Sequence, residues 1–153
     1  MSKRAEQSGE EQRMSQLTPR LQEIVEDFDF LAGTEKLEYL LELAENLPPL
    51  PEWLQNQRDS LDQVHECMTP VFIYAEKKNG HLTYHFDIPP EAPTVRGFAA
   101  VLQEGLEGAT PEEVQGIPNE FYLEMGLQNV MSGQRLNGMS AILAHMKQLA
   151  QKE

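Results

Sequence analysis

The chain of 153 residues contains a single cysteine, Cys67. One thiol can neither close an internal disulfide nor assemble a cysteine-rich metal site. Any chemistry at Cys67 is therefore that of one sulfur atom acting alone, as a nucleophile or as a carrier of sulfur. A free cysteine is also among the most commonly buried residues, so a purely structural role stays open.

Basic residues and long apolar runs are scarce as well. The chain has 12 lysines and arginines against 25 aspartates and glutamates, which gives a formal net charge of −13. Such a surface repels phosphate backbones and anionic membranes, so we expect no nucleic-acid partner and no membrane partner, and a basic protein patch is the favoured contact. No run approaches the roughly 20 apolar residues that span a bilayer, and residues 1–7 lack the apolar core of a secretion signal. We therefore expect a cytoplasmic or stromal location.

The length favours one domain with a single core. Residues 1–16 are polar and rich in Glu, Gln and Ser, which predicts a disordered tail in front of a folded domain at residues 17–153.

Helical periodicity and its start and stop signals recur along that domain. Thr18-Pro19 supplies an N-cap and a first-turn proline for a helix that ends at Gly33, and Thr34 caps a second helix that the prolines at 48, 49 and 51 terminate. Two further apolar stripes at helical spacing cover residues 95–106 and 136–149, and Thr110-Pro111-Glu112-Glu113 is a capping box. The polar segment 52–63 is expected to be a loop.

Strand signals are concentrated before the middle helix. Residues 71–75 and 82–86 alternate in polarity on either side of Asn79-Gly80, the strongest short signal for a β-hairpin. A third strand is expected near residues 60–66. Together these elements predict an α+β fold, in which a small antiparallel sheet of about three strands is covered by helices.

Several separated landmarks resemble, in order and approximate spacing, those of the SufE family of sulfur acceptor proteins. They are the acidic helix at 36–43, the Leu-Pro-Pro-Leu-Pro break at 47–51, the run Val64-His65-Glu66-Cys67-Met68-Thr69-Pro70-Val71-Phe72, the run Val95-Arg96-Gly97-Phe98, and Arg135-Leu136-Asn137-Gly138-Met139. The resemblance covers nearly the whole chain. Two positions depart from the family pattern, which has Gly-Cys where this chain has Glu66-Cys67 and Val-Trp where it has Val71-Phe72.

The resemblance implies a SufE/IscU-like sandwich whose cysteine accepts sulfur. In that family a SufS-like cysteine desulfurase, which depends on pyridoxal phosphate, forms a persulfide, and the acceptor takes its outer sulfur, stimulates the desulfurase, and passes the sulfur to an iron–sulfur cluster scaffold complex. Carried over here, Cys67 is the persulfide acceptor and Arg135 stabilises the sulfur anion or docks the partner. The protein itself is then not an enzyme and binds no cofactor. Gly97 is read as a position that permits close helix packing.

Two other classes of function use the same residues. A thiol-dependent hydrolase would pair Cys67 with His85 or His81, but it needs oxyanion donors at the thiol, and the residues after Cys67 have the pattern of a strand. A metal or cluster scaffold would use His65-Glu66-Cys67, a spacing unlike established ligand sets. Arg135, for its part, could simply be a solvated arginine at the start of a helix.

Overall fold

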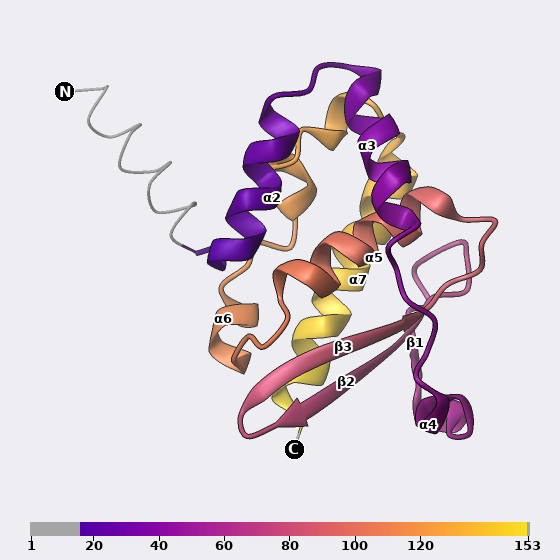
Figure 1. Cartoon of the computed structure of the whole chain (residues 1–153). Helices are drawn as coiled ribbons and strands as arrows, with labels where there is room; N and C mark the ends of the chain where they lie inside the picture. Colours follow the sequence, from indigo (N-terminus) through magenta and orange to yellow (C-terminus); the bar gives the residue numbers. More distant parts are fainter. Residues whose placement is uncertain (1–15, 153) are drawn as a thin grey trace.

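A computed structural model of the chain describes residues 16–152. The disordered tail expected at residues 1–16 lies, apart from Gln16, outside the described residues. The elements, in chain order, are α2 (Pro19–Asp29), α3 (Thr34–Ala44), α4 (Glu52–Gln55), the 3-10 helix η1 (Arg58–Ser60), β1 (Asp62–Gln63), β2 (Phe72–Lys78), β3 (His81–Asp87), α5 (Pro93–Gly105), α6 (Pro111–Gln115), the 3-10 helices η2 (Phe121–Leu123) and η3 (Leu127–Asn129), and α7 (Gly133–Gln151) (Figure 1).

The strands form one antiparallel sheet in the order β1-β2-β3, which confirms the predicted α+β class. The hairpin turns at Asn79 and Gly80, whose φ angles of 55° and 80° are both positive, as a tight hairpin turn requires. Its register places Tyr74 opposite His85. The third strand is present, but it is shorter than the expected 60–66.

The inner face of the hairpin packs against α5 and α7. Leu82, Tyr84 and Phe86 of β3 are buried on this face. The Tyr84 hydroxyl donates a hydrogen bond to the Met146 carbonyl oxygen at 2.8 Å, which ties the sheet to α7. A buried tyrosine needs such a partner, because an unpaired hydroxyl in the core is costly.

The expectation of a loop at 52–63 is wrong for the first part of this segment, which contains α4 and η1, whereas β1 falls within the expected third strand. α4 carries Trp53 onto the outer face of the sheet, where its ring meets Tyr74 edge-on at a centroid distance of 5.7 Å and His85 at 5.8 Å. A helix of four residues is too short to show periodicity, and its position depends on this aromatic contact.

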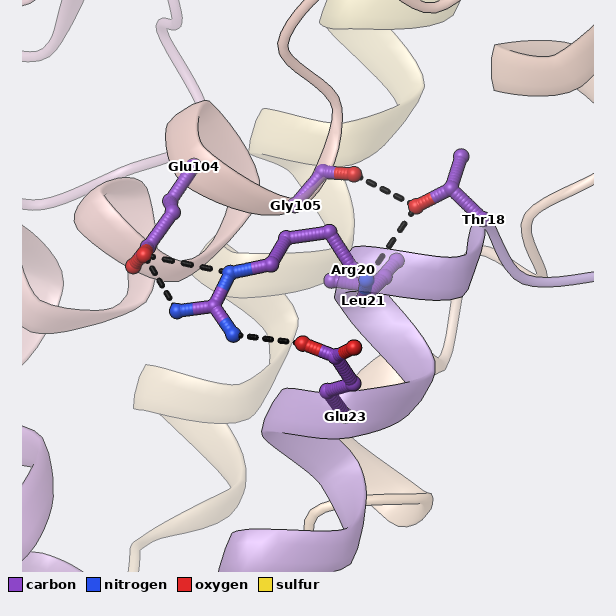
Figure 2. A network of polar contacts seen from close by, with 6 residues as sticks. All are labelled: Thr18, Arg20, Leu21, Glu23, Glu104 and Gly105. Atoms are coloured by element: carbon purple, nitrogen blue, oxygen red, sulfur yellow. Dashed lines mark hydrogen bonds and ion pairs between the residues drawn. The ribbon is translucent and has the colours of Figure 1, made fainter.

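The start of α2 was predicted correctly. The Thr18 hydroxyl accepts a hydrogen bond from the Leu21 N–H and donates one to the Gly105 carbonyl oxygen at the end of α5 (Figure 2). Beside it, Arg20 pairs with Glu104 across the same two helices. The cap therefore serves α2 and its contact with α5 together.

Two details of the next turn differ from the prediction. α2 ends at Asp29, before the predicted stop at Gly33. Gly33, with φ 57°, takes the N-cap position of α3, and Thr34 makes no capping hydrogen bond. A left-handed residue at this corner suits glycine, which lacks the Cβ that disfavours this conformation.

α3 crosses α5 at Gly97, in agreement with the prediction that this glycine permits close helix packing. A Cβ atom at Gly97 would overlap the carbonyl oxygen of Leu40, so only glycine allows this approach. The capping box at Thr110 and the helices predicted at 95–106 and 136–149 are also confirmed. Within residues 16–152, no helix is both long and apolar enough to cross a bilayer.

Candidate functional site

Cys67 lies on the loop that joins β1 to β2. The Val64 N–H donates to the Val71 carbonyl oxygen at 2.9 Å, which extends the pairing of β1 with β2 and closes the loop from His65 to Pro70. Val64 and Val71 are both completely buried. The loop is thus short and anchored at both ends in the core, and its tip carries the thiol.

The thiol is half-buried and faces the second turn of α7. Its Sγ donates a hydrogen bond to the Gly138 carbonyl oxygen at 3.5 Å. On the other side, Cys67 packs against the hydrophobic core. The neighbouring Met68 is 81% exposed, so adjacent residues of the loop point in opposite directions.

The thiol is a weak acid in this position. Burial and, to a smaller extent, the negative charge of Glu66 together raise the pKa of Cys67 to about 11. Because the thiolate is the nucleophile, Cys67 is almost entirely in the unreactive thiol form at neutral pH. A reaction at this sulfur requires a change of surroundings that favours the anion.

A cavity of about 420 Å³ opens beside the sulfur. It is lined by the tip of the cysteine loop and by the first turns of α5 and α7, namely Cys67, Met68, Thr69, Glu91, Ala92, Pro93, Thr94, Val95, Ser132, Gln134, Arg135 and Gly138. The N-terminal end of a helix carries a partial positive charge. Two such ends beside one sulfur favour negative charge in the cavity, whereas burial, the charge of Glu66 and the cavity-lining Glu91 oppose it.

The structure brings both predicted site residues, Cys67 and Arg135, to this one cavity. Four cavity-lining residues lie at the start of α7, namely Ser132, Gln134, Arg135 and Gly138. Of these, Ser132, Arg135 and Gly138 are three positions apart and so share one face of the helix. Ser132 is the N-cap, and its hydroxyl accepts a hydrogen bond from the Arg135 N–H at 3.3 Å. The Arg135 side chain is exposed at the mouth.

The sequence reasoning missed the other half of the cavity. Residues 91–95 and Gly138 were not selected as site residues, because their contact with the cysteine loop is a tertiary one. Val95 and Gly138 belong to the quoted family landmarks but were not assigned a role, and Ser132 carried a local signal, since a serine just before an apolar-periodic segment is a typical N-cap.

No histidine of the described chain lines the cavity. His85 lies on the outer face of the sheet, where its Nε2 is 2.8 Å from the Glu76 Oε2, and His81 Nδ1 is 2.8 Å from the Gly108 carbonyl oxygen. The dyad of a thiol hydrolase is therefore not assembled. Between residues 16 and 152, no group of three or more His, Cys, Asp or Glu side chains is placed to hold a metal ion.

The fold and the site define a class of small α+β protein with one half-buried thiol, on an anchored loop, in a cavity formed by two helix ends. The model of the SufE family, described as an Fe-S metabolism associated domain, matches residues 22–150. The chain belongs to the SufE family.

Proteins similar to this chain come from distant organisms. An uncharacterized SufE-like protein of Mycobacterium tuberculosis is 41% identical over 128 residues, which cover 83% of this chain and 88% of that protein. The cysteine desulfuration protein SufE of Plasmodium vivax is 25% identical and matches 86% of this chain and 52% of its own length. The solution structure of a hypothetical protein from Thermus thermophilus superposes with a TM-score of 0.76 at 37% identity, covering 88% of this chain and 95% of that one.

Proposed function

We propose that the protein accepts sulfur on Cys67 from the persulfide of a cysteine desulfurase and delivers it to an iron–sulfur scaffold. The observation that carries the proposal is the placement of the only thiol of the chain, half-buried, in a cavity with Arg135 and two helix N-termini. The family's association with Fe-S metabolism and the name of the Plasmodium relative, a cysteine desulfuration protein, support it.

The transfer is an exchange at sulfur that needs no external oxidant. The Cys67 thiolate attacks the outer sulfur of the donor's persulfide, a new S–S bond forms on Cys67, and the donor's S–S bond breaks. The electron pair leaves with the donor's sulfur, which takes up the proton that Cys67 released. The products are a persulfide on Cys67 and a free thiol on the desulfurase.

The surroundings of Cys67 suit its two states differently. In the resting protein the Gly138 carbonyl oxygen accepts the S–H, and an acceptor in that position favours the protonated thiol. In the persulfide the negative charge lies one bond further out, on the outer sulfur. There the helix ends and the Arg135 guanidinium, which is permanently charged, favour the anion.

The partner supplies the remaining chemistry. The donor is a SufS-like desulfurase, whose pyridoxal phosphate releases sulfur from free cysteine, and the recipient is a cluster scaffold complex. With a net charge of −13, the chain is suited to a partner with a basic surface. The exposed Met68 at the loop tip and Arg135 at the cavity mouth are the contacts that we assign to docking. In this role the protein is an accessory that stimulates the desulfurase, not an enzyme, and it works in the reducing cytoplasm.

The test is intact-mass analysis of the protein after incubation with a pyridoxal-phosphate cysteine desulfurase and free cysteine. We expect the added mass of one sulfur atom, removed by dithiothreitol and absent from Cys67→Ser treated in parallel. If the wild-type chain gains no sulfur while a known acceptor does so with the same desulfurase, the proposed function is wrong.

A further inference from the structure

The residue of α7 that contacts the Cys67 sulfur, Gly138, is a glycine in the interior of a helix. Gly138 is buried in the second turn of α7, where glycine costs helix stability relative to alanine. Its φ is not positive, so the backbone conformation does not require glycine. The reason for a glycine at this position has to lie in the space beside it.

The space beside Gly138 lies against the sulfur atom of Cys67. A Cβ atom built on Gly138 would lie 3.4 Å from the Cys67 Sγ, and no other atom of the described chain beyond its own helix and neighbours comes within 4 Å. A separation of 3.4 Å is ordinary van der Waals contact. A methyl group at position 138 is therefore compatible with the thiol form of Cys67, and it takes up the part of the cavity that lies directly against the sulfur.

A persulfide needs that volume. Its outer sulfur lies about 2.05 Å from Sγ. It cannot point along the S–H direction of the resting thiol, because the Gly138 carbonyl oxygen is only 3.5 Å from Sγ in that direction. The core blocks the inner side of Cys67. The outer sulfur therefore turns toward the cavity, where the neighbouring wall at Gly138 carries no side chain.

We propose that the absence of a side chain at Gly138 leaves room for one extra sulfur atom beside Cys67. The persulfide of Cys67 can then stay inside the cavity, where the thiol also lies. This inference deepens the proposed function and rests on it. It makes Gly138 a specificity-determining residue that separates two states of the same cysteine. A side chain at position 138 admits the thiol and expels the persulfide toward solvent.

Gly138→Ala tests this, with Gly133→Ala as the matched control. Gly133 begins the same helix, and a Cβ atom there meets nothing within 4 Å. Both changes favour the helical conformation. The persulfide is formed with inorganic tetrasulfide, without any desulfurase. The Cys67 thiolate attacks one terminal sulfur of the tetrasulfide, so that an S–S bond forms on Cys67 and the terminal S–S bond of the tetrasulfide breaks. Trisulfide leaves with the electron pair. Cys67 is the only cysteine, so loading is confined to one site.

Two rates are compared in the three proteins. Alkylation of the unloaded thiol by iodoacetamide should agree within about twofold, since the thiol keeps its contacts. Dithiothreitol should release sulfide from loaded Gly138→Ala about tenfold faster than from the other two proteins, or this variant should be loaded correspondingly less. The reason is that the added methyl group overpacks the persulfide inside the cavity.

Equal loading and equal sulfide release in all three proteins would overturn the inference. So would alkylation of Gly138→Ala at the rate of an unfolded control, because the thiol itself would then have lost its place. Either result would overturn the role of Gly138 without changing the outcome of the desulfurase experiment. Conversely, a failure of sulfur transfer from the desulfurase would contradict the proposed function without affecting the measurements on the chemically formed persulfide.

Discussion

The backbone N–H of Val64 donates to the carbonyl oxygen of Val71 across 2.9 Å, and both side chains are completely buried. This pair separates the cysteine loop from the sheet. The loop from His65 to Pro70 can change shape without breaking the pairing of β1 with β2, because that pairing lies on the far side of the Val64–Val71 bond. The position of Cys67 is consequently adjustable, whereas the positions of its anchors are fixed.

Cys67→Ser is expected to abolish stimulation of a cysteine desulfurase and to preserve the fold. A hydroxyl is close to a thiol in size and can donate to the Gly138 carbonyl oxygen, but it cannot accept sulfane sulfur. We expect a loss of stability of less than about 1 kcal/mol. Alanine or sulfide production measures the stimulation, and the circular-dichroism spectrum checks the fold. Unchanged stimulation would remove Cys67 from the mechanism.

Glu66→Gln should lower the pKa of Cys67, and the pKa should stay above its ordinary value. Burial is the larger cause of the increase to about 11, and the charge of Glu66 is the smaller one. Iodoacetamide alkylation of the wild type should accelerate about tenfold per pH unit between pH 8 and 10, in step with the thiolate fraction. The variant should react faster throughout this range. Glu112→Gln on α6 is the control, and a rate equal to that control would exclude an influence of Glu66.

The same pKa shift links stability to pH. Because the folded state holds the Cys67 proton more tightly than the unfolded chain does, this contribution to stability is complete below pH 9 and declines as the pH rises from 9 to 11. Cys67→Ser should lack this part of the decline in a series of urea titrations.

Arg135→Ala is expected to impair sulfur transfer and leave stability almost unchanged. The side chain is exposed, so its loss should cost no more than about 0.5 kcal/mol of folding free energy. Loss of a hydrogen bond to a charged group costs about 1.5 to 3 kcal/mol, which is a tenfold or larger drop in transfer or affinity. Arg135→Lys keeps the charge but loses the planar fork. Normal transfer and affinity in Arg135→Ala would make this residue an ordinary solvated arginine.

Thr18→Ala should destabilise the protein by about 1 to 2 kcal/mol. The substitution removes an N-cap of α2 and a buried hydrogen bond to Gly105 at once. Arg20→Ala nearby is the comparison, because its ion pairs are about half exposed and are worth less than about 1 kcal/mol. Urea denaturation ranks the two. A larger loss for Arg20→Ala would contradict the cap as the main link between α2 and α5.

Gly97→Ala should cost about 1 to 3 kcal/mol despite the higher helix propensity of alanine. The added methyl group would overlap the Leu40 carbonyl oxygen, and backbone atoms yield little. Gly133→Ala, which meets open space, serves as the control in thermal unfolding. Equal midpoints for the two variants would mean that α3 and α5 separate easily.

The parts of the fold that could be predicted are those whose cause lies in neighbouring residues. Asn79-Gly80 specifies its hairpin, Thr18 and Thr110 cap their helices, and apolar stripes mark the long helices. α4 was missed because its position depends on the packing of Trp53 on Tyr74, which lies three elements further along the chain.

The candidate site divides in the same way. Cys67 and Arg135 were selected through their place in a family pattern, and the structure puts both at one cavity. Gly138 was not selected, because its contact with Cys67 joins residues 71 positions apart and a glycine leaves no periodic signal. The shape of the cavity around a reactive atom depends on tertiary packing, so it cannot be predicted from patterns in a single sequence.

α7 is tied to the hairpin at its C-terminal end and capped at its N-terminal end. The Lys77 ammonium group donates to the carbonyl oxygens of Ala150 and Lys152 at 3.1 Å each, which clamps the C-terminal end of the helix to the hairpin. Ser132 caps the other end, beside Cys67. These contacts fix the C-terminal end of α7 to the sheet, and a displacement of the cysteine loop is sufficient to separate Sγ from Gly138. A partner that draws the loop outward works against one weak hydrogen bond and the packing of a single side chain, while the frame that receives the loop again stays in place.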